Sequence, residues 1–132
     1  MTPVFQNDEH GCGVACVAMI LSVSYAKARR ICGDAYDPSD GICEKPMIEI
    51  LKSKGFHIVR RGRITLDKPA TQLKRNALLW GHLLPSRGTI DREKNVYNHW
   101  ALWDFEAQAI RDPYRYKKPM RLTKFFEVAP AE

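Results

Sequence analysis

The chain of 132 residues lacks several features that would assign it directly to a class of protein. It has no run of eighteen apolar residues, and no basic N-terminal region followed by an apolar stretch, so neither a membrane span nor a secretory signal is indicated. It also has no internal repeat, no low-complexity stretch and no linker. We therefore expect a single soluble, cytoplasmic domain over residues 1–132.

Motifs that bind phosphates and nucleic acids are missing as well. The sequence has no Gly-rich phosphate loop, no zinc-finger spacing and no aromatic-rich strand motif. Its net charge of +6 is spread over several short basic groups, a pattern that is typical of a solvated surface but also compatible with an anionic membrane face or an acidic peptide. A nucleic acid partner is the less favoured alternative.

Cysteine is scarce and confined to the first third of the chain, at Cys12, Cys16, Cys32 and Cys43. Without a secretory signal we expect a reducing environment, in which an even number of cysteines is weak evidence for disulfides. Only Cys12 and Cys16 are spaced like zinc ligands, and no second pair follows them. We expect no metal and no cofactor. Cys32 and Cys43 are expected to pack, with a disulfide between them as the alternative.

Hydrophobic periodicity divides the chain into a helical half, about residues 1–55, and a sheet half, about residues 56–132. Three stretches of the first half are typical of helices: "GVACVAMILS", "SYAKARRIC" and "CEKPMIEILKSKG", with turn chemistry in "DAYDPSDG". Four stretches of the second half are typical of strands: "FHIVRRGRITL", "NALLWGHLL", "VYNHWALWDFE" and "AQAIRDPY", with a polar loop at "SRGTIDREKN". The predicted fold class is α+β, with N-terminal helices packed on a C-terminal antiparallel sheet.

Residues 6–21, "QNDEHGCGVACVAMIL", contain the first candidate for chemistry. Cys12 stands at the start of an apolar helix, where unpaired N–H groups and the positive end of the helix dipole stabilise a thiolate. Gly11 and Gly13 flank it and have no Cβ to obstruct a substrate backbone. Cys16 lies one turn inside the helix and is expected to be a small core hydrophobe. The alternative for Cys12 is a buried structural thiol.

A nucleophilic thiol needs a base, and the base needs a group that orients it. His99 lies in "VYNHWALW", the strongest predicted strand of the second half, and Asp112 follows the next strand in "IRDPY". Antiparallel pairing through a short turn would bring the two side by side. Taken alone, His99 is typical of a packed histidine and Asp112 of a turn. The order Gln6, Cys12, His99, Asp112 favours catalysis, because papain-like sites use this order with the glutamine in the oxyanion hole.

The sequence resembles the bacteriocin-processing cysteine peptidases, which are papain-like domains at the front of bacterial ABC exporters and remove double-glycine leader peptides. The resemblance rests on the upstream glutamine, "CGVACVAMIL", "LKSKGF", "HWALW" and "DP" in that order, and covers nearly the whole chain. It implies that Cys12 is the nucleophile, His99 the general base, Asp112 its orienting partner and Gln6 the oxyanion donor. It also implies a peptide or protein substrate that is cut after Gly-Gly, and an ABC exporter or secretion system as partner.

Four neighbours of the predicted nucleophile and base are further candidates for substrate binding: Gly11, Gly13, Asn98 and Trp100. No transporter sequence accompanies the domain, so a free-standing relative or an excised domain is expected. Two other functions remain open. One is a papain-like toxin or effector that acts on a target protein or RNA, and the other is a catalytically silent module that binds a peptide.

Overall fold

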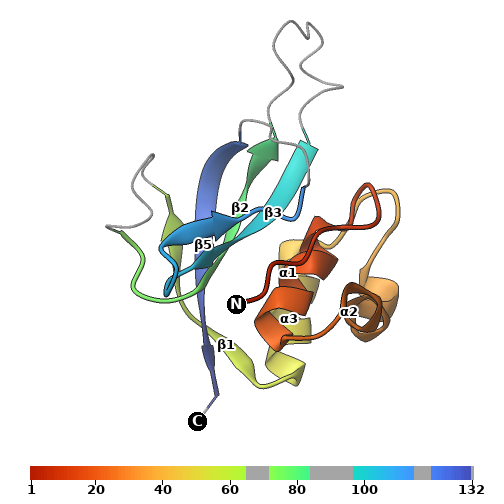
Figure 1. Ribbon diagram of the computed structural model, residues 1–132, viewed down its shortest axis with the longest axis horizontal. Helices are drawn as coiled ribbons and strands as arrows, with labels where there is room; N and C mark the ends of the chain where they lie inside the picture. The colour runs from red at the N-terminus through yellow and green to blue at the C-terminus, as the bar shows by residue number, and fades with distance from the viewer. Residues whose placement is uncertain (65–71, 84–96, 115–119, 132) are drawn as a thin grey trace, which may run out of the picture.

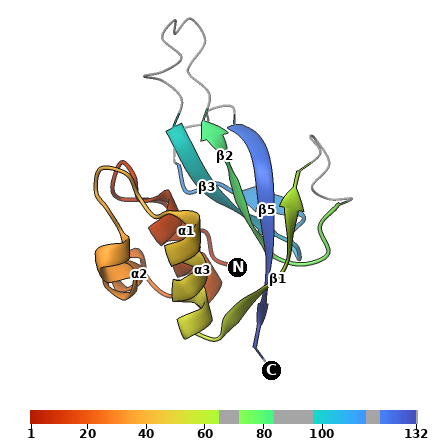
Figure 2. The same cartoon turned by 180° about the vertical axis from the view of Figure 1, so that it is seen from behind.

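The computed structural model describes residues 1–64, 72–83, 97–114 and 120–131. In these residues three N-terminal helices pack against one face of a five-stranded antiparallel sheet, and Figures 1 and 2 show the helices gathered on the same side of the strands from both directions. The predicted α+β class, with helices first and an antiparallel sheet after them, is confirmed. The polar loop predicted at residues 86–95 lies outside the described residues.

The three predicted helices are present as α1 (Cys12–Leu21), α2 (Tyr25–Cys32) and α3 (Glu44–Ser53). Helix α1 is apolar throughout and buried from its first residue to Met19, as suits a central helix. Ser24 caps α2 by accepting a hydrogen bond from the main-chain N–H of Lys27 at 3.1 Å. Gly55, with φ at 87°, follows α3 in the left-handed region that favours glycine.

No single helix of the described residues has the length and hydropathy of a membrane span. Helix α1 and the segment Tyr25–Ala35 meet that test only as a pair, and the pair is bent by 107°.

The five strands follow in the second half of the chain. They are β1 (Phe56–Arg63), β2 (Ala77–Leu83), β3 (Tyr97–Asp104), β4 (Ala109–Arg111) and β5 (Met120–Pro130). The first four confirm the sequence prediction, including the hairpin of β3 and β4. Strand β5 was missed, although it lies inside the sheet, in the order β1-β5-β2-β3-β4.

A bulge explains why the last strand does not show simple alternation. The pairing of β5 with β2 shifts between Trp80 and Gly81, which face Lys124 and Leu122, so Thr123 is an extra residue on β5. As a result Leu122 packs with the cluster on one side of the sheet, while Phe126 packs with the helices on the other. Apolar residues therefore do not alternate regularly with polar ones along β5, and this makes the strand difficult to recognise from the sequence.

The two faces of the sheet have separate cores. Leu78, Trp100 and Phe126 pack against α1 on the helix side, and Leu79 and Trp103 belong to the cluster on the opposite side. Neighbouring residues of a strand point to opposite faces. Strand β3 therefore fixes Trp100 beneath the start of α1 and carries His99 next to it along the chain.

Candidate active site

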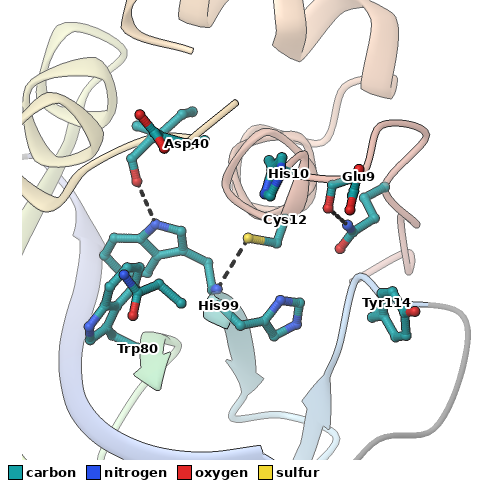
Figure 3. Close-up of a pocket in the computed structure, with 12 residues that line it drawn as sticks. Glu9, His10, Cys12, Asp40, Trp80, His99 and Tyr114 are labelled. Carbon is teal, nitrogen blue, oxygen red and sulfur yellow. Dashed lines mark hydrogen bonds between the residues drawn. The ribbon is translucent and has the colours of Figure 1, made fainter. Parts of the chain in front are cut away.

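A cavity of about 140 Å³ lies where the N-terminal end of α1 meets β3 (Figure 3). Six segments line it: the one before α1, the start of α1 itself, the loop before α3, β2, β3, and the one after β4. The lining residues are Gln6, Glu9, His10, Cys12, Asp40, Gly41, Ile42, Trp80, Asn98, His99, Trp100 and Tyr114. The cavity thus brings together Gln6, Cys12, Asn98, His99 and Trp100 of the residues predicted from the sequence.

Cys12 is the first residue of α1 and is only 7% exposed. Gly11 precedes it as the N-cap, and α1 has no side-chain capping bond in the described structure. The free N–H groups at this helix end are therefore available to an anion. The main-chain N–H of Trp100 also donates a hydrogen bond to Cys12 Sγ at 3.3 Å, which holds the sulfur against β3 (Figure 3).

His99 and Asp112 are in direct contact, as the β3 to β4 hairpin predicts. His99 Nε2 lies 2.6 Å from Asp112 Oδ1, and the same oxygen accepts a hydrogen bond from the main-chain N–H of Tyr114 at 2.9 Å. The Tyr114 ring meets the His99 ring edge-on, with centroids 6.4 Å apart. His99 is 2% exposed, so its ring is held in one orientation by a carboxylate and an aromatic neighbour.

The pKa of His99 reflects opposing effects. Burial by itself lowers it, but hydrogen bonds to Asp112 and to Cys12, together with the negative charges of both, raise the pKa from its ordinary value of 6.5 to about 9. Since Nε2 bonds to Asp112, Nδ1 is the ring nitrogen left to face the thiol. The arrangement favours a protonated imidazole in contact with the Cys12 sulfur.

Cys16 is unsuited to the same chemistry. It is completely buried, and its pKa is raised well above the ordinary value by desolvation, with smaller contributions from the charges of Cys12 and Asp112. It is a core residue, as predicted.

The other two cysteines differ from each other. All four cysteines are free, and Cys32 is buried while Cys43 is exposed. The packing role is therefore confirmed for Cys32 and wrong for Cys43, whose side chain lies at the surface just before α3.

Gln6 lines the cavity, but its amide is turned into its own loop. Its Nε2 donates to the carbonyl oxygens of Asp8 at 3.1 Å and Glu9 at 2.9 Å. Its Oε1 is buried and has no partner in the described residues. The main-chain N–H of Gln6 donates to Pro113 O at 3.0 Å, which ties this segment to the turn that carries Asp112. The oxyanion role of Gln6 stays a prediction that requires rotation of its side chain.

Gly11 and Gly13 are not among the residues that line the cavity. A Cβ on Gly11 would lie 2.0 Å from the hydroxyl oxygen of Tyr25, and a Cβ on Gly13 would lie 2.9 Å from Met47 Cε and 3.2 Å from Trp100 Cδ1. Close packing inside the protein therefore explains why both positions are glycine. Their predicted contact with a substrate backbone finds no support in the cavity.

Two tryptophans form one wall of the site. Trp100 is 1% exposed, its indole N–H donates to Ile42 O at 2.9 Å, and its ring lies 4.7 Å from that of Trp80 between centroids. Asn98 is exposed at the rim. Sequence reasoning missed Trp80, Ile42 and Tyr114. Trp80 lies directly opposite Trp100 in the pairing of β2 with β3, so a correct alignment of these two predicted strands would have indicated it.

Among the residues that the structure describes, no group of three or more His, Cys, Asp or Glu side chains is arranged to hold a metal ion. Comparison with known protein families and with curated proteins finds no matching family and no matching relative. The geometry of Cys12, His99 and Asp112 is therefore what points to a function.

Proposed function

We propose that the protein is a papain-like cysteine peptidase that hydrolyses a peptide bond through an acyl-enzyme. The observation that carries the proposal is the linked set of Cys12, His99 and Asp112, in which a thiol at an uncapped helix start faces an imidazole bonded to a carboxylate at 2.6 Å. The division into a helical layer that bears the nucleophile and a sheet that bears the base supports a papain-like fold.

The charges and hydrogen bonds of the site define the role of each group. The Cys12 thiolate attacks the carbonyl carbon, and the N–H groups at the start of α1 stabilise the oxyanion that forms. Protonated His99 then gives its Nδ1 proton to the leaving amine. The neutral imidazole next takes a proton from water, whose oxygen attacks the thioester and releases the acid. Gln6 joins the oxyanion hole once its amide leaves the carbonyls of Asp8 and Glu9.

The size of the cavity supports a substrate with small residues at the cut. A volume of about 140 Å³ equals that of roughly five water molecules in the liquid, and the paired rings of Trp80 and Trp100 fill the wall where a larger side chain would sit. A Gly-Gly segment at the end of a leader peptide fits this space. An ABC exporter or secretion system that supplies such a precursor in the cytoplasm is part of the same proposal.

The two other functions differ in what they require of this site. A silent peptide-binding module has no need of His99 bonded to Asp112 beside a thiol. A papain-like toxin or effector would use the same residues on another target, so the substrate distinguishes it from a processing peptidase.

Alkylation with iodoacetamide at neutral pH tests the proposal, with each cysteine quantified by peptide mass mapping. We expect Cys12 to react about tenfold faster than the exposed Cys43, although Cys12 is nearly buried, because its thiolate is stabilised. His99→Ala should remove this advantage and leave the rate of Cys43 unchanged, which makes Cys43 an internal control. A Cys12 that reacts no faster than Cys43, with or without His99, would refute the activated thiol.

A further inference from the structure

A row of four side chains crosses the sheet from the catalytic cavity toward its far edge. The strand register pairs Trp100 with Trp80, Trp80 with Lys124, and Lys124 with Arg63. Directly opposite residues of neighbouring strands point to the same face, so all four belong to the face on which the helices pack. Because Trp100 and Trp80 line the cavity beside Cys12, the row leads from the nucleophile to two cations.

A second cavity, of about 250 Å³, lies at the cationic end of this row. Arg61, Arg63 and Lys124 line it together with Phe126 and Glu44. Three positive charges thus face a single carboxylate. Phe126 gives the cavity an apolar wall, against which the methylene groups of a longer side chain can pack.

In the described residues, the three cations of this cavity take no part in the ion pairs of the fold. Arg29, Arg60, Arg75 and Arg111 each lie within ion-pair distance of a carboxylate. Arg61, Arg63 and Lys124 are exposed, and in the described ranges of the chain no salt bridge joins them to an acidic residue. Their charges are therefore available to an external anion.

The spacing of the strands sets the distance between the two cavities. From Trp100 to Arg63 the row spans three interstrand spacings of about 4.8 Å, roughly 14 Å in all. An extended peptide covers about 3.3 Å per residue, so about four residues connect the scissile bond to the cationic cavity. We propose that Arg61, Arg63 and Lys124 form a subsite for acidic side chains of the peptide substrate, about four residues from the bond that is cut. The subsite rests on the proposed peptidase function, because its occupant is the chain bound at Cys12.

Matched peptides test the subsite. Internally quenched peptides with one central Gly-Gly carry either Glu-Glu or Gln-Gln at the fourth and fifth positions, before the cut in one pair and after it in a second pair. We expect kcat/KM for one Glu-Glu peptide to exceed that of its Gln-Gln counterpart by about fivefold to tenfold at low ionic strength, and the ratio to fall as salt screens the charges.

Substitutions locate the preference. The double variant Arg63→Gln, Lys124→Gln should reduce the ratio of acidic to neutral kcat/KM to about one. Lys52→Gln removes an exposed charge from the last turn of α3 and should leave the ratio as it is in the wild type. Circular dichroism confirms that each variant is folded.

The outcomes separate the two proposals. Cleavage of all four peptides with no preference for glutamate, or a preference that survives the double variant, would overturn the subsite and leave the peptidase in place. If no peptide is cleaved by a protein whose Cys12 alkylates slowly, the peptidase proposal fails and the subsite fails with it.

Discussion

Replacement of Asp112 by asparagine removes a charge beside His99 and keeps the shape of the acceptor. Asp112 Oδ1 accepts from His99 Nε2 and from the N–H of Tyr114, and an asparagine oxygen can accept both bonds. A neighbouring opposite charge shifts a pKa by about 1 to 3 units, and the hydrogen bond that asparagine keeps retains part of this effect. The substitution therefore removes about 1 to 1.5 kcal/mol of stabilisation from the imidazolium, which is about one pKa unit.

A titration of the histidine ring by NMR measures this shift. The pKa of His99 is about 9 in the wild type, and we expect Asp112→Asn to lower it by about one unit. His57, exposed on β1 at the opposite edge of the sheet, is the control, and the substitution should leave its titration curve in place. An unchanged or raised midpoint for His99 would show that Asp112 does not stabilise the imidazolium.

The same substitution predicts a pH-dependent change in stability. The folded pKa of His99 lies above its ordinary value of 6.5, so the folded state binds the proton more tightly than the unfolded state. This stabilisation is fully present below pH 6.5 and is lost as the pH rises through about 9. The difference in unfolding free energy between wild type and Asp112→Asn should therefore be about 1 to 1.5 kcal/mol at pH 6 and should shrink toward zero at pH 10, as measured by urea denaturation.

Two further substitutions probe the surroundings of Cys12. Cys16→Ala should lower the unfolding free energy by about 1 kcal/mol through a small core cavity and leave the alkylation rate of Cys12 unchanged; a folded variant without activity would mean that Cys16 is the reactive thiol. Gly11→Ala places a Cβ 2.0 Å from the hydroxyl oxygen of Tyr25 and should cost about 1 to 3 kcal/mol by overpacking, measured by urea denaturation. If Gly11→Ala is as stable as the wild type, the segment before α1 adjusts more easily than its packing indicates.

The elements that the sequence predicts are those whose pattern is local. Helix α1 is a continuous apolar stretch, α2 has a serine cap, and a glycine with positive φ follows α3. Strand β5 was missed because its bulge puts Leu122 and Phe125 on one side and Phe126 on the other. Its place between β1 and β2 depends on pairings with residues at least 37 positions earlier in the chain, the separation of Leu83 and Met120, which no local pattern expresses.

In the candidate active site, too, the features set by local structure are predicted and those set by tertiary contacts are not. Asp112 reaches His99 because β3 and β4 form a short hairpin, in which Leu102 pairs with Arg111. The orientation of the Gln6 amide and the packing of Gly11 instead depend on one loop. In that loop Asp8 bonds to the Tyr25 hydroxyl at 2.7 Å, while its carbonyl oxygen accepts from Gln6 and Gly11. Tyr25 lies 17 positions after Asp8 in the chain, so this contact depends on the tertiary structure, and the sequence predicts the residues of the loop but not how they point.

The short length of β4 explains how the nucleophile reaches its base. In the described structure β4 has three residues and pairs with β3 only from Leu102 to Asp104. The preceding part of β3 is therefore open on that side, and the N–H of Trp100 donates to Cys12 Sγ instead of to a strand. A β4 strand extended by two residues would compete for this N–H and occupy the place of the helix start. Contact between Cys12 and His99 thus depends on a strand that ends early, in addition to the properties of the two side chains.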